Sequence, residues 1–92
     1  ESRAPGMLAA HYAPRATLLL ADTRAQANEL AGRHSGSWVL DHSDDLVTYA
    51  RSLYAELRAA DDRGTPVVVA VLPTATGLGH AIRDRLTKAA HS

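Results

Sequence analysis

Apolar residues gather in three short runs, which predict three buried strands. The runs span Thr17–Ala21, residues 37–41 and residues 66–72, and turn-forming residues border each of them. The third run is continuous and rich in β-branched valine, which is typical of a strand that is covered on both faces. We therefore expect residues 66–72 to form the central strand of a sheet.

The first of three predicted helices follows the first run. Thr23 and Gln26 have the spacing of a capping box, in which each side chain bonds a free backbone N–H at the helix start. An i, i+3, i+4 stripe of apolar residues comes next, and Gly32 or Gly36 can end the helix.

Two longer amphipathic helices are predicted in the second half of the chain. One spans residues 44–62, with Ser43 as its expected N-cap. Its apolar stripe consists of Leu46, Ala50, Leu53, Tyr54 and Leu57. The other spans residues 80–90, where Asp84 and Lys88 have the i, i+4 spacing of an ion pair.

The predicted order is strand, helix, strand, helix, strand, helix. Strands that alternate with helices need crossover connections, so the sheet should be mostly parallel with helices on both faces. We therefore predict an α/β fold, a small three-layer sandwich whose sheet has three to four strands. Residues 16–92 would form this domain, and residues 1–15 would form a separate segment in front of it.

Composition narrows the possible functions. The chain has 92 residues, enough for one small domain, and its ten basic and ten acidic residues give no net charge. Contact with nucleic acid would therefore need a local patch. Without cysteine, disulfides and thiolate metal sites are excluded. No apolar run approaches the length of a membrane span, so we expect a cytoplasmic protein without membrane contact.

One turn has the composition of an anion site. Gly77, Gly79 and His80 lie where a strand gives way to a helix, and backbone N–H groups at such a helix start can bind phosphate. The alternative is a turn in which a glycine lets the helix approach the sheet. No metal site and no catalytic set is predicted, because the five histidines are scattered: His11, His34, His42, His80 and His91.

The segment before the first strand, "APGMLAAHYAP" at residues 4–14, is framed by prolines. It resembles the linker motif of long-form L-threonylcarbamoyladenylate synthases, which join a YrdC-like catalytic domain to a smaller C-terminal domain. "YARSLYAELRAADDRG" and "GLGHAIRDRLTKAA" are similar to two further segments of that C-terminal domain, in the same order. Since the chain starts at Glu1 and its only methionine is Met7, we expect a piece of a longer polypeptide.

The resemblance implies a Rossmann-like accessory domain that is not an enzyme by itself and needs no cofactor. Its partner would be the YrdC-like domain, a nucleotidyltransferase that uses ATP with magnesium, threonine and bicarbonate to make threonylcarbamoyl-AMP for tRNA modification. In that family the linker folds over the catalytic cleft. The residues of this chain that would face the nucleotide are Pro5, Gly6, Met7, His11 and Tyr12.

Two departures from the family pattern and several alternatives accompany this interpretation. Leu8 stands where many relatives carry a basic residue, and the region between Ala21 and Asp41 is short. Tyr12 could instead anchor the linker on its own domain. The domain could also be an independent module that binds tRNA or protein, with support from the basic residues Arg83, Arg85 and Lys88. A third alternative is a small nucleotide-binding domain that uses the Gly77–Gly79 turn.

Overall fold

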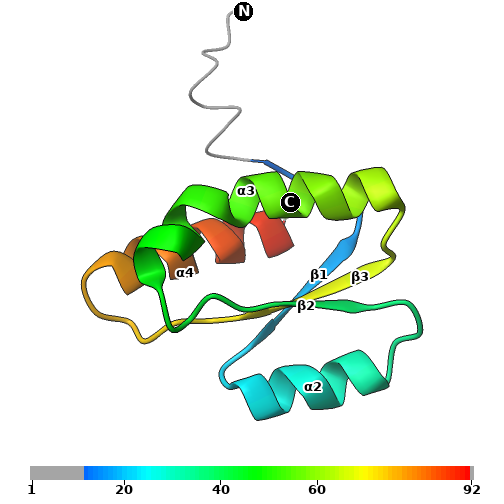
Figure 1. The fold of residues 1–92 in the computed structure, drawn as a ribbon, viewed down its shortest axis with the longest axis horizontal. Helices are drawn as coiled ribbons and strands as arrows, with labels where there is room; N and C mark the ends of the chain where they lie inside the picture. The colour runs from blue at the N-terminus through cyan, green and yellow to red at the C-terminus, as the bar shows by residue number, and fades with distance from the viewer. Residues whose placement is uncertain (1–11, 92) are drawn as a thin grey trace, which may run out of the picture.

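Three strands and three helices alternate along residues 12–91, the part of the chain that the computed structural model describes (Figure 1). This order confirms the predicted alternation. The elements are β1 (Thr17–Ala21), α2 (Arg24–Gly32), β2 (Trp38–Leu40), α3 (Leu46–Arg63), β3 (Val67–Val71) and α4 (Leu78–Ala90).

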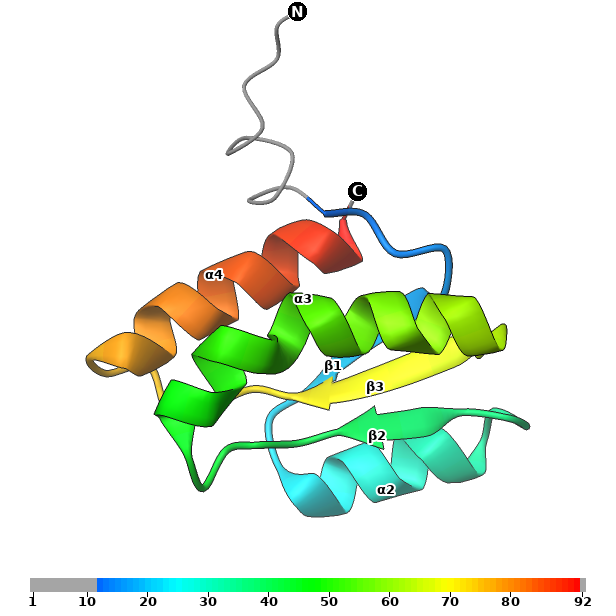
Figure 2. The same cartoon turned by 45° about the horizontal axis from the view of Figure 1, so that its top comes forward.

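The sheet is fully parallel and has the strand order β1-β3-β2, so β3 is the central strand as predicted. Thr17 pairs with Val67 at one end of the β1–β3 register, and Ala21 pairs with Val71 at the other. The chain steps from β1 across to β2 and then back to β3. Because parallel crossovers are right-handed, these opposite steps place α2 on one face and α3 on the other. Helix α4 packs beside α3, which completes the three layers seen in Figure 2.

The helix ends show which side chains satisfy the free backbone groups. Thr23 caps α2 by accepting the Gln26 N–H at 3.0 Å, as predicted. The Ser43 prediction is wrong, because Asp45 is the N-cap of α3 and accepts the Thr48 N–H at 3.1 Å. The Ser43 hydroxyl instead donates to Asp41 at 2.6 Å. Helix α3 therefore spans 46–63, and α4 begins at residue 78, two positions before the predicted start.

The core has two parts because the side chains of β3 alternate across the sheet. Val68 and Ala70 face α3 and α4, whereas Val69 and Val71 face α2. The α3 stripe is centred differently from the prediction: Leu46, Ala50 and Tyr54 are only half-buried. The fully buried residues of α3 and α4 are Tyr49, Leu53, Leu57, Ala60, Ile82 and Leu86.

The described segment begins and ends on the same side of the molecule. Helix α4 runs back to the edge where β1 starts, and its last turn lies beside the first described residues in both views (Figures 1 and 2). Tyr12 and Ala90 pack against the same core cluster. The carboxyl ends of the strands form the opposite edge. Within residues 12–91, no helix combines the length and apolar character needed to cross a membrane.

Candidate functional site

The end of the predicted linker is attached to α3 by one carboxylate. Tyr12 donates its hydroxyl hydrogen bond to Asp61 Oδ2. The Arg15 N–H donates to both Asp61 oxygens at 3.0 and 3.1 Å, and the Ala16 N–H donates to Oδ1 at 2.9 Å. We call residues 12–16 together with Asp61 the linker junction. Its side-chain hydroxyl and two backbone N–H groups converge on a residue that is 8% exposed.

Aromatic and cationic groups surround the Tyr12 ring. The ring of Tyr54 meets it edge-on, with centroids 6.2 Å apart and an interplanar angle of 74°. The Arg58 guanidinium carbon lies 5.8 Å from the Tyr12 ring centroid, which is within range of a cation–π interaction. The ring is therefore held by contacts with α3 in addition to its hydroxyl bond.

The pKa values of the two partners move apart at this junction. Burial, followed by the hydrogen bond to Asp61, raises the pKa of the Tyr12 hydroxyl to about 12. Burial alone would raise the pKa of the Asp61 carboxyl, but the bonds from Tyr12, Arg15 and Ala16 outweigh it and lower that pKa. Tyr12 thus remains a neutral donor and Asp61 a charged acceptor across the physiological range.

Of the five residues predicted to face a nucleotide, the structure describes only Tyr12. Pro5, Gly6, Met7 and His11 lie outside the described residues. Tyr12 contacts its own domain, which is the anchoring arrangement that the sequence left open as an alternative. Anchoring by the tyrosine is compatible with a nucleotide contact elsewhere in the linker, and that contact stays a prediction.

Packing requires glycine at residue 79, the second glycine of the Gly77–Gly79 turn. A Cβ added to Gly79 would lie 2.0 Å from the backbone oxygen of Thr74. The Gly79 N–H already donates to the Thr76 carbonyl at 2.9 Å, and the His80 N–H donates to the Gly77 carbonyl at 3.1 Å. These bonds engage two of the N–H groups that an anion would use, and binding of phosphate at this turn stays a prediction.

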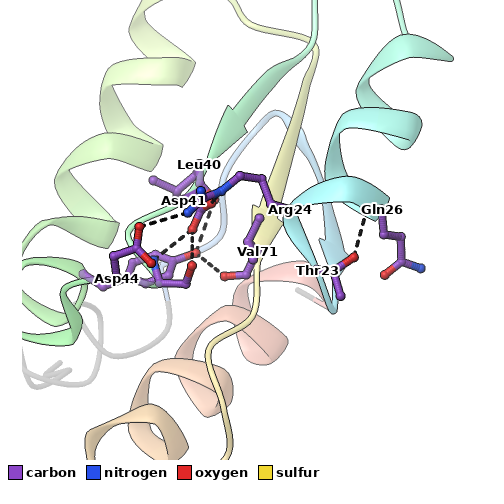
Figure 3. A network of polar contacts seen from close by, with 9 residues as sticks. Thr23, Arg24, Gln26, Leu40, Asp41, Asp44 and Val71 are labelled. Carbon is purple, nitrogen blue, oxygen red and sulfur yellow. Dashed lines mark hydrogen bonds and ion pairs between the residues drawn. The ribbon is translucent and has the colours of Figure 1, made fainter.

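Side chains bridge the carboxyl edge of the sheet, where open α/β folds commonly bind ligands (Figure 3). Arg24, which follows β1, reaches Asp41 after β2 at 2.5 Å and Asp44 at 3.1 Å. Beneath this bridge the buried Tyr49 hydroxyl donates to the Val71 carbonyl at 2.7 Å. Among residues 12–91, no group of three or more His, Asp or Glu side chains is arranged to hold a metal ion.

Burial on its own would raise the pKa of the Asp41 carboxyl. Hydrogen bonds from the Ser43 side chain and backbone and from Arg24 outweigh that effect and lower it. The acid is therefore charged and already occupied by groups of its own chain. We conclude that the carboxyl edge is braced internally.

Three contacts in the structure were not predicted from the sequence. Asp61 is the first of two aspartates in the "YARSLYAELRAADDRG" segment, but its partner Tyr12 lies 49 residues away. His42 and Glu56 form a 2.5 Å contact between the loop after β2 and α3. Arg83, one of the basic residues considered for tRNA binding, donates to the Pro73 carbonyl at 2.9 Å. No local signal in the sequence indicates these pairings.

Comparisons with known proteins agree over nearly the whole chain. The family model described as threonylcarbamoyl-AMP synthase, C-terminal domain, matches residues 1–91. The chain is also similar to the threonylcarbamoyl-AMP synthase of Pyrococcus abyssi, with 32% identity over 96% of this chain. The match spans 32% of that relative's length, and the alignment of 108 positions exceeds this chain's 92 residues, so the relative has residues that this chain lacks. No solved structure matches the chain.

Proposed function

The chain belongs to the family of threonylcarbamoyl-AMP synthase C-terminal domains, and we propose that it is the accessory domain of such a synthase. In this proposal a YrdC-like catalytic domain of the same polypeptide binds ATP with magnesium, threonine and bicarbonate, and makes threonylcarbamoyl-AMP and pyrophosphate. The domain itself performs no chemistry. It holds the interdomain linker, residues 1–15, so that the linker closes over the nucleotide.

The observation that carries the proposal is the linker junction. Residues 12–16 are fixed to α3 by Tyr12 and by two backbone N–H groups. A linker attached so firmly at one end presents its preceding residues from a defined point, which reduces the entropy lost when they dock. Pro5, Gly6, Met7 and His11 would then meet the nucleotide, and Tyr12 would serve both as anchor and as the end of the nucleotide-facing segment.

The side-chain contacts across the carboxyl edge of the sheet support a role in which this domain binds no nucleotide itself. Arg24 and Asp41 connect the ends of the two outer strands at the edge where a Rossmann-like domain would bind its ligand. A ligand there would have to displace this ion pair. This favours the accessory role over the alternative of a small nucleotide-binding domain.

Three forms of the longer synthase test the proposal: the full polypeptide, a form that ends after residue 15, and a form that ends before residue 1. The assay measures pyrophosphate release that depends on both threonine and bicarbonate. We expect high activity only from the full polypeptide, because a linker without its anchor is not held over the cleft. Full activity in the form that ends after residue 15 would contradict the proposal, as would turnover by the 92-residue chain alone.

A further inference from the structure

Asp61 occupies a place on α3 that is electrostatically unfavourable for a carboxylate. It lies in the last turn of the helix, two residues before the final residue Arg63. The carboxyl end of a helix carries partial negative charge and therefore disfavours an acid. Asp62, its neighbour, is exposed to water, whereas Asp61 is buried. The burial of this particular charge calls for compensation by specific donors.

All the donors that the described residues supply to the Asp61 carboxylate come from the linker junction. They are the Tyr12 hydroxyl and the N–H groups of Arg15 and Ala16. Neither the sheet nor α4 supplies a hydrogen bond to it in residues 12–91. The carboxylate therefore holds residues 12–16, which lead into β1, against α3.

The junction fixes the path of residues 12–16 at more than one point. One carboxylate binds the chain at residue 12 through a side chain and at residues 15 and 16 through the backbone. Pro14 lies between these points and has a restricted φ, so the enclosed segment has few alternative paths. Contact of the Tyr12 ring with Tyr54 and Arg58 limits rotation of the side chain. The path of residues 12–16 along α3 is thus set by Asp61.

We propose that Asp61 is a positioning residue of the synthase reaction, which acts by holding Tyr12 and the backbone of residues 15 and 16 against α3. This inference rests on the proposed function. Asp61 touches neither substrate nor the reacting atoms in this scheme. Loss of its carboxylate would leave the catalytic domain chemically intact but release residues 12–16 from α3.

The position of the linker junction relative to α2 is measured on the 92-residue chain itself. The chain has no cysteine, so Ala13→Cys and Asn28→Cys, both at exposed positions, accept one spin label each. We expect a narrow distribution of label distances that broadens in Asp61→Asn and in Tyr12→Phe. Asp62→Asn, a matched change on the same turn, should leave it narrow. An unchanged width in both junction variants overturns the inference.

Amide hydrogen exchange provides a second readout that does not depend on the labels. Asp61→Asn removes the negative charge and replaces one of the two acceptor oxygens with an NH2 donor, so exchange of the Arg15 and Ala16 amides should accelerate. Tyr12→Phe keeps the carboxylate and should accelerate these amides much less. Should Asp61→Asn fail to fold, Tyr12→Phe still tests the inference, because it removes only one hydroxyl.

Activity in the longer synthase then tests the functional half of the inference. At a temperature where circular dichroism shows every variant to be folded, Asp61→Asn should lower kcat roughly 10- to 100-fold, the loss expected when a catalytic element moves by about 1 Å. The KM for threonine should stay near its original value, and Asp62→Asn should behave like the unaltered enzyme. Equal kcat in Asp61→Asn and the unaltered enzyme overturns the positioning role.

These outcomes separate the two proposals. If removal of residues 16–92 leaves synthase activity intact, the proposed function fails, even when the spin labels report a fixed position of the junction. If that removal abolishes activity while Asp61→Asn does not, the accessory role stands and the positioning role of Asp61 fails.

Discussion

Gly79 provides a sharp test of how α4 is seated on the sheet. An alanine there would place its Cβ 2.0 Å from the Thr74 oxygen and 3.2 Å from the Thr74 carbonyl carbon. Carbon–oxygen contacts below 3.0 Å essentially never occur at a Cβ. The obstacle is backbone, and the same oxygen accepts the Thr76 N–H at 2.9 Å, so the turn must shift by about 1 Å and weaken that bond.

The expected destabilisation follows from two opposing terms. Overpacking of this kind costs typically 1–3 kcal/mol and occasionally more. Replacement of glycine by alanine within a helix stabilises the folded state by up to about 1 kcal/mol. We therefore expect Gly79→Ala to lower the free energy of unfolding by about 2 kcal/mol, which corresponds to roughly 8–16 °C in Tm for a domain of this size.

Gly32→Ala is the matched control, because Gly32 ends α2 and a Cβ there would meet nothing within 4 Å. The same substitution should leave stability unchanged or raise it by up to about 1 kcal/mol. Urea unfolding followed by circular dichroism measures both variants on one scale. If Gly79→Ala is as stable as Gly32→Ala, the close contact with Thr74 is not what requires glycine, and anion binding becomes the better explanation for it.

Three further predictions concern tyrosines and the junction carboxylate. Tyr49→Phe leaves the Val71 carbonyl without its buried donor and should cost about 1–3 kcal/mol in urea unfolding; an unchanged midpoint would show that this bond contributes nothing. Because the folded pKa of Tyr12 is raised from 10.0 to about 12, its contribution to stability is fully present below pH 10 and is lost as pH rises toward 12. The Tm difference between the unaltered chain and Tyr12→Phe should therefore shrink over that window, and a constant difference would refute the assignment. The pKa of Asp61 is lowered from 3.8, so its contribution is present above pH 3.8 and is lost as pH falls below it; Asp61→Asn should flatten this acid limb of the Tm curve.

The order and layering of the elements could be predicted from the sequence because they depend on local patterns. A continuous β-branched run identified β3 as the central strand, and Asp84 and Lys88 form their expected i, i+4 pair at 3.1 Å. The N-cap of α3 was harder to predict, because Ser43 and Asp45 are both good acceptors two positions apart. Only the competing bond from Ser43 to Asp41 decides between them.

The site was harder to predict because its contacts join distant parts of the chain. In the sequence Asp61 and Asp62 look alike at the end of a helix, yet only Asp61 receives donors from 45 to 49 residues away. Tyr49 was not part of the predicted apolar stripe, yet it is fully buried, and a carbonyl on β3 accepts its hydroxyl hydrogen bond in the core. Long-range hydrogen bonds of this kind leave no periodic signal.

The first and last described residues lie close together, which makes this domain a candidate for circular permutation. A short peptide that connects residue 91 back to residue 12 would close the backbone into a ring, and the ring could be reopened at the exposed turn around Ser35, between α2 and β2. Such a permuted chain would retain every parallel pairing of the sheet while its new ends emerge from the turn between α2 and β2. It would show whether the domain still folds by itself when its original chain ends are joined.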